Sequence, residues 1–158
     1  MYASAKIKWK ELITSLLIAL GTGGLSTLIT GNFEIYNTLE RPPLAPPAAV
    51  FPVVWTILFA LMGISAYMIY ISDSPDKKTA LIVYGVQLFF NFLWPVIFFR
   101  AQLFLPAFIW LVILWLLVAL MIILFKRIKP IAGLLQIPYL IWLTFAGYLN
   151  LMVYLLNR

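Results

Sequence analysis

The chain has no cysteine and no histidine among its 158 residues. Without cysteine it lacks disulfides and thiolate metal ligands. Without histidine it lacks the commonest general base and the commonest zinc and haem ligand. Charged residues are also scarce, at 10% of the composition against 65% for hydrophobic residues. This balance lies far outside that of soluble domains and is typical of an integral membrane protein.

Five apolar runs occupy most of the sequence, each close to the ~20 residues with which a helix crosses a bilayer. All Lys, Arg, Asp and Glu residues lie outside these runs. An ion-coupled pump would therefore lack an intramembrane ionisable group. We predict an all-α membrane protein with a single domain over residues 1–158, a bundle of five transmembrane helices at residues 12–30, 51–71, 79–99, 103–125 and 131–156.

The first connection, residues 31–50, is much longer than the other three and carries proline pairs at 42–43 and 46–47. Proline fixes φ and disfavours helix, so this segment should be stiff and extended. We predict that it forms a lid over one end of the bundle.

The net charge of +6 is distributed as a topology signal. Basic residues on alternate sides of the five runs number eight against three, with Lys6, Lys8, Lys10, Lys77, Lys78, Lys126, Arg127 and Lys129 opposed to Arg41, Arg100 and Arg158. The asymmetry predicts a cytoplasmic N-terminus and an external C-terminus in a bacterial cell membrane. Membrane lipids, and no nucleic acid, are the partners that these charges favour.

Aromatic and polar side chains recur at helical spacing on three of the runs. Such faces could converge on an aromatic cavity with a few amide and indole groups, which is typical of a small-molecule site. The amides could equally serve only to hydrogen-bond neighbouring helices, and spacing does not separate the two uses. A stripe of small residues on the first run indicates helix packing. The faces comprise Phe51, Trp55, Phe59 and Met62; Tyr84, Gln87, Asn91 and Trp94; and Tyr139, Trp142, Ala146 and Asn150; the stripe comprises Ser15, Ala19, Gly23 and Thr27.

Three ordered motifs resemble the signatures of the TspO/translocator protein family, the tryptophan-rich sensory proteins also called peripheral benzodiazepine receptors. The motifs are RPPLAPPAAVFPVVWTILFALMGISAY, QLFFNFLWPVIFF and PYLIWLTFAGYLN. The resemblance extends from Glu34 to Asn157. The chain departs from the family at Leu44, where tryptophan is usual between the proline pairs.

The resemblance implies a five-helix bundle, often a homodimer, whose pocket under the first loop binds porphyrins, notably protoporphyrin IX. It also implies binding of hydrophobic benzodiazepine-site ligands such as isoquinoline carboxamides. No cofactor or metal is required, and porphyrin is the ligand or substrate. Matched to the family motifs, the ligand-binding positions are Pro46, Phe51, Trp55, Phe59, Gln87, Phe90, Asn91, Trp142, Ala146 and Leu149.

Some family members promote light-dependent breakdown of protoporphyrin IX. Because an excited porphyrin can take an electron from an adjacent indole, the resemblance implies Trp55 and Trp142 as catalytic residues. The family's sterol-recognition pattern can be written as Leu151, Tyr154 and Arg158, but tyrosine and arginine are common at helix ends. A transporter of porphyrin or lipid-like cargo and a ligand-gated regulator remain alternative functions.

Overall fold

The computed structural model describes residues 6–158, and within them the regular structure is helical. Five helical spans are long and apolar enough to cross a membrane, with bounds within three residues of those predicted. A short 3₁₀ helix lies in the first loop. The elements are α1 (Trp9–Thr30), η1 (Phe33–Asn37), α2 (Val50–Tyr70), α3 (Lys77–Pro95), η2 (Val96–Arg100), α4 (Phe104–Ile128), α5 (Pro130–Leu134) and α6 (Ile137–Leu156).

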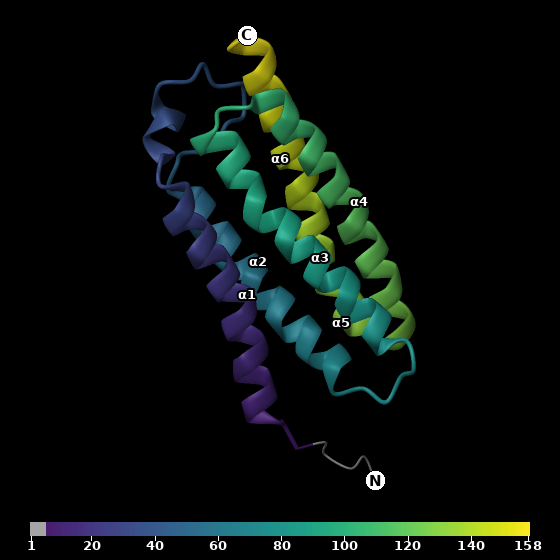
Figure 1. The fold of residues 1–158 in the computed structure, drawn as a ribbon. Helices are drawn as coiled ribbons and strands as arrows, with labels where there is room; N and C mark the ends of the chain where they lie inside the picture. The colour runs from purple at the N-terminus through teal and green to yellow at the C-terminus, as the bar shows by residue number, and fades with distance from the viewer. Residues whose placement is uncertain (1–5) are drawn as a thin grey trace.

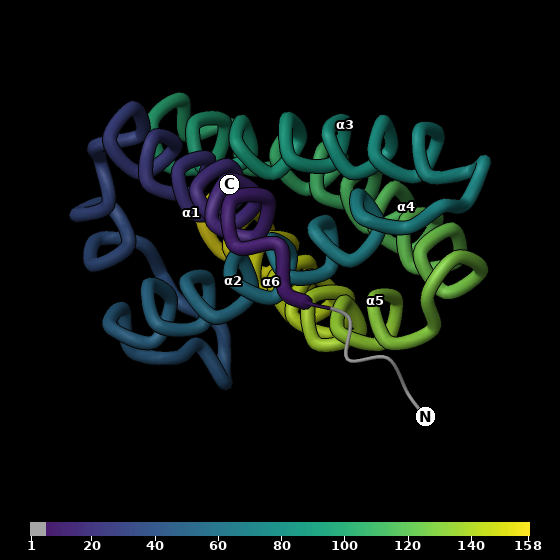
Figure 2. Tube along the Cα trace, turned by 90° about the horizontal axis from the view of Figure 1, so that it is seen from below, coloured from purple at the N-terminus to yellow at the C-terminus, as the bar shows by residue number. Residues whose placement is uncertain are grey.

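The long helices pack as a bundle in which α1 lies between α2 and α3 (Figure 2). Helix α3 also packs on α4, α4 packs on α6, and α5 packs on α2. The first loop and the C-terminus lie at the same end of the bundle, opposite the N-terminal end of α1 (Figure 1). We call this the lid end.

Two prolines interrupt the regular helices. Pro95 cannot donate a hydrogen bond to the carbonyl of Asn91, and the chain after it forms the π-helical turn η2. Pro138 falls in the first turn of α6, so the fifth run consists of α5 and α6 rather than the single helix predicted from its hydropathy.

The expectation of an extended first loop is wrong, since its first part is helical and its proline-rich part forms turns. Residues Phe33–Asn37 form η1, because they precede the prolines and nothing restrains them from helical angles. The proline-rich part folds into successive turns, with Ala45 N donating to Pro42 O and Val50 N to Pro47 O.

Side-chain hydrogen bonds hold the loop on the lid end of the bundle. Asn157 makes a reciprocal pair with the Glu40 backbone, at 3.0 Å for both bonds. The Tyr148 hydroxyl on α6 donates to Pro43 O at 3.0 Å. The loop is therefore attached to α6 at two points separate from its chain connections to α1 and α2.

Helices α1 and α2 are in close contact away from the lid end. The Ser15 hydroxyl donates to Gly63 O at 2.7 Å, and a Cβ on Gly63 would lie 2.9 Å from Leu16 Cα. This confirms a packing role for the start of the small-residue stripe on α1.

Candidate ligand-binding site

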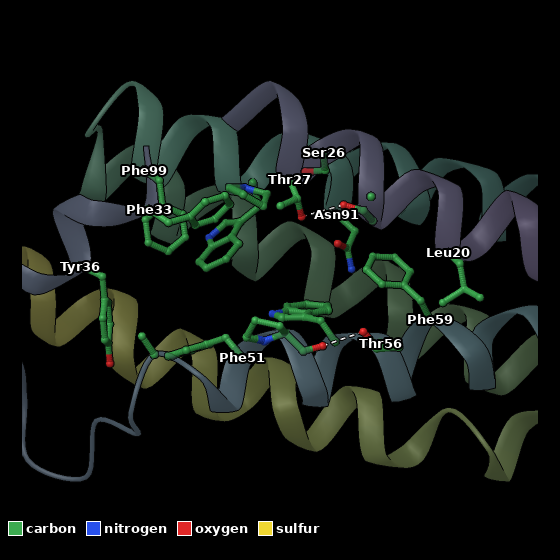
Figure 3. Close-up of a pocket in the computed structure, with 17 residues that line it drawn as sticks. Leu20, Ser26, Thr27, Phe33, Tyr36, Phe51, Thr56, Phe59, Asn91 and Phe99 are labelled. Carbon is green, nitrogen blue, oxygen red and sulfur yellow. Dashed lines mark hydrogen bonds between the residues drawn. The ribbon is translucent and has the colours of Figure 1, made fainter. Parts of the chain in front are cut away.

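A cavity of about 390 Å³ lies between α1, α2 and α3 at the lid end (Figure 3). Its volume falls in the lower part of the range typical of small-molecule sites. Among residues 6–158, no charged side chain lines it. Aromatic rings form much of its wall, from the first loop, α2, α3 and η2: Phe33, Tyr36, Phe51, Trp55, Phe59, Trp94 and Phe99.

Four of the ten residues proposed from the sequence line this cavity. Phe51, Trp55 and Phe59 follow one another at four-residue spacing along α2, which places them on one face of the helix. Asn91 lies opposite them on α3 (Figure 3). The structure therefore brings together the α2 and α3 faces.

Gln87 lies one turn from Asn91 but behind the cavity wall. It is completely buried, and its side-chain oxygen accepts a hydrogen bond from the Tyr139 hydroxyl at 3.0 Å. That hydroxyl in turn accepts from the Asn91 amide group. Tyr139 thus links the two amides and orients the one that reaches the cavity.

Trp142 stands behind the α2 wall and does not line the cavity. Its ring lies 5.9 Å from the ring of Phe51 and 6.5 Å from that of Trp55, perpendicular to the latter. Its indole nitrogen is buried without a hydrogen-bond partner among residues 6–158. The two tryptophans proposed as a functional pair are therefore neighbours, with Trp55 in front.

The remaining proposed residues lie away from the cavity lining. Phe90 stacks on Trp110 of α4 at 4.2 Å. Ala146 and Leu149 are buried on α6. Pro46 acts through its carbonyl oxygen, which accepts a hydrogen bond from the Tyr36 hydroxyl at 2.9 Å.

Helix α1 forms a wall that the sequence did not predict as part of the site. A Cβ on Gly23 would lie 2.5 Å from a ring atom of Phe59, so the glycine makes room for that ring. The small-residue stripe was the available signal, but it indicates close approach without naming what approaches. The α1 lining residues are Leu20, Gly23, Gly24, Ser26 and Thr27.

Most polar groups of the cavity wall are already hydrogen-bonded within the chain. The hydroxyls of Ser26, Thr27 and Thr56 each donate to a backbone carbonyl. The Trp94 indole donates to Asn150. Within residues 6–158 the Trp55 N–H and the Asn91 side-chain oxygen make no hydrogen bond, so they offer a ligand a donor and an acceptor amid apolar rings.

Tyr36 closes the cavity toward the loop. The Arg41 side chain lies over its ring, 5.4 Å from the ring centroid. Burial raises the pKa of Tyr36, and the positive charge of Arg41 offsets part of that rise. The hydroxyl therefore stays protonated at neutral pH and able to donate to Pro46 O.

Comparison with known proteins gives consistent matches over nearly the whole chain. A sequence model of the TspO/MBR family matches residues 13–155. The tryptophan-rich protein TspO of Chlorobaculum tepidum is 33% identical over 148 residues, which cover 92% of this chain and 94% of the relative. The tryptophan-rich sensory protein of Cereibacter sphaeroides is 34% identical over 146 residues, with 92% and 91% covered. The translocator protein of Ovis aries is 32% identical over 147 residues, with 90% and 87% covered.

Proposed function

Because the chain belongs to the TspO/MBR family, we propose that it is a membrane receptor or sensor that binds porphyrins, protoporphyrin IX above all, and benzodiazepine-site ligands. The observation that carries the proposal is the uncharged cavity walled by aromatic rings under the first loop. Rings that enclose a flat guest contribute both buried area and favourable ring–ring geometry.

The few free polar groups orient the guest. Trp55 offers its N–H to an acceptor of the ligand, and Asn91 offers its oxygen to a donor. A carboxylate is costly to bury without a partner. The propionates of a porphyrin therefore stay at the loop end, where Arg41 lies beside the cavity wall.

Light-dependent porphyrin breakdown is the enzymatic part of the proposal. An excited porphyrin in the cavity takes one electron from Trp55, the indole in contact with it, which leaves a porphyrin radical anion and an indole radical cation. Dissolved dioxygen is the co-reactant that oxidises these radicals and completes the breakdown. Trp142, 6.5 Å behind, is the next donor in line. Both residues act as electron donors and neither requires a metal.

Transport of porphyrin or lipid-like cargo is the second candidate, since one similar protein is named a translocator protein. The charged residues of the five spans all lie in their first or last turns: Lys10 and Glu11 in α1, Lys77 and Lys78 in α3, Arg100 at the end of η2, and Lys126 and Arg127 in α4. Active, ion-coupled transport therefore has no coupling group in the bilayer interior. Passive passage through the cavity is compatible with the fold.

The proposed orientation places the N-terminus in the cytoplasm and the lid end outside, on the eight-to-three asymmetry of basic residues. A topology reporter fused after Arg158 should be active outside the cytoplasm. A cytoplasmic signal from that fusion would reverse the orientation.

Titration of the full chain in nanodiscs tests ligand binding. Protoporphyrin IX should quench tryptophan fluorescence saturably, and an isoquinoline carboxamide should compete. Trp55→Ala should weaken binding about tenfold or more, because losing a buried aromatic contact costs above ~1.4 kcal/mol. Trp115→Ala is the control, since Trp115 donates to Thr144 outside the cavity. Equal affinity in both variants, or the same signal from empty nanodiscs, would contradict the proposal.

A further inference from the structure

A shallow apolar hollow lies on the opposite side of α6 from the cavity, between that helix and the tip of the first loop. Leu44 of the loop and Ile141, Thr144, Phe145 and Tyr148 of α6 line it. Leu44 and Ile141 are 81% and 65% exposed. Two large aliphatic side chains left open side by side suggest an apolar covering.

The loop tip is held in this position against the preference of its backbone. Leu44 has φ of 70°, in the left-handed region that a leucine rarely adopts. The Tyr148 hydroxyl holds the preceding Pro43 carbonyl at 3.0 Å. The contact thus directs an aliphatic side chain outward, along the flank of a membrane-spanning helix.

The depth of the hollow follows from helix α4. Its uninterrupted apolar stretch from Phe104 to Phe125 measures about 33 Å at 1.5 Å per residue, which matches a hydrocarbon core of about 30 Å. The Asn150 amide donates to Phe104 O at 2.8 Å, so Asn150 marks the boundary of that core on α6. Tyr148 then lies about 3 Å and Ile141 about 14 Å below the boundary.

The polar groups of the hollow have partners within the chain. The Thr144 hydroxyl donates to Leu140 O and accepts from the Trp115 indole. The Tyr148 hydroxyl donates to Pro43 O. Its walls are bulky apolar side chains rather than the small residues at which membrane helices approach each other closely. Acyl chains, which need no hydrogen bonds, fit such a surface better than a second copy of this chain.

We propose that the first loop is anchored in the bilayer, with Leu44 inserted at the edge of the hydrocarbon core and a lipid acyl chain lying in the hollow beside it. The inference does not depend on which ligand occupies the cavity. It makes the loop a membrane-attached lid: Leu44 contacts lipid, while Pro46, two residues later, contacts Tyr36 of the cavity wall. A change in the lipid leaflet at the lid end that moves Leu44 would then also move Pro46 and the Tyr36 side chain that bonds to it.

Site-directed spin labelling tests the proposal directly, because the natural chain contains no cysteine. Leu44→Cys, Ile141→Cys and Glu40→Cys would each carry one nitroxide in nanodiscs of phosphatidylcholine and phosphatidylglycerol. Oxygen concentrates in the bilayer and a nickel chelate stays in water. The rates at which the two reagents relax the nitroxide therefore report how deeply the label lies in the bilayer. Ile141 is the lipid-facing reference, and Glu40 is the exposed reference on the same loop.

The label at Leu44 should behave like that at Ile141, with relaxation by oxygen several-fold stronger than by the nickel chelate. Tyr148→Phe in the same background should shift it toward nickel, because the loop tip is released. A Leu44 label as open to nickel as the Glu40 label would overturn the proposal. Strong dipolar coupling between Leu44 labels of two copies would also overturn it, by assigning the hollow to a dimer contact.

Discussion

Gly23 of α1 lies against the ring of Phe59 of α2, so closely that a Cβ on the glycine would be 2.5 Å from the ring. Both residues line the cavity. The shape of the cavity beside Phe59 therefore depends on residue 23 being glycine. Any larger residue at position 23 must displace the Phe59 ring, and the space beside it is the cavity.

We predict that Gly23→Ala reduces ligand affinity and destabilises the protein by about 1–3 kcal/mol, the usual cost of overpacking. Gly21→Ala on the same helix is the matched control, because a Cβ there meets nothing within 4 Å. It should leave ligand affinity unchanged and raise stability by up to ~1 kcal/mol, because alanine is a better helix former than glycine. Thermal unfolding in detergent and porphyrin titration measure the two effects, and equal behaviour of the two variants would contradict the role of Gly23.

Tyr139→Phe should uncouple Asn91 from Gln87. The variant removes one hydroxyl that serves both amides, leaving buried polar groups unpaired at a cost of about 1–3 kcal/mol. Ligand affinity should also fall, because the Asn91 oxygen loses its fixed direction. The Tyr154 hydroxyl, farther along α6, makes no such bond within the described part of the chain, so Tyr154→Phe should change stability by no more than about 0.5 kcal/mol. Wild-type affinity in Tyr139→Phe would show that Asn91 needs no such support.

The helix count and the place of the long proline-rich loop could be predicted from the sequence, because hydropathy and proline act locally. Which side chains line the cavity, and which lie behind them, could not be predicted from the sequence. Asn91 and Gln87 share one face of α3, yet only Asn91 lines the cavity. The Gln87 side chain is completely buried and hydrogen-bonds to Tyr139 and Met62 instead. Helical spacing identifies a face, but tertiary packing decides which residue on it remains open.

The same limit explains the tryptophans. Trp55 and Trp142 each lie on the ring-bearing face of a helix, and the family resemblance implied that both contact the ligand. In the structure they pack edge-on against each other, so one covers the other. The part of the cavity wall that α1 forms could not be predicted for a different reason. Glycine has no side chain, so its position in the sequence does not indicate a binding site.

The Asn157 side chain should control how long a ligand stays bound. Asn157→Ala removes both bonds to the Glu40 backbone. Amide hydrogen exchange at Glu40 should accelerate, and ligand dissociation with it, while Arg158→Ala should match wild type. Replacing Pro46 and Pro47 by glycine should have a similar effect through greater loop entropy. Unaltered dissociation in all these variants would remove the lid from the mechanism.

Substitution of the two indoles separates chemistry from packing. Trp55→Phe keeps an aromatic ring in the cavity wall, so it should retain much of the porphyrin affinity yet lose most of the light-dependent conversion. Trp142→Phe should lose less, because its ring lies behind Trp55. Porphyrin absorbance during illumination measures the rate. Full conversion by the double variant would leave a binding protein without this enzymatic activity.

The most direct test of a porphyrin site in the cavity uses the chain's six tryptophans as position markers. Protein in nanodiscs is illuminated briefly with bound protoporphyrin IX, and oxidation at each tryptophan is quantified by mass spectrometry, with and without excess isoquinoline carboxamide. Trp55 and Trp94, which line the cavity, should be modified first, Trp142 next, and the competitor should protect all three. Oxidation that begins at Trp9, which is 64% exposed, or at Trp110 and Trp115, and that the competitor does not change, would place the porphyrin in the lipid and contradict the account.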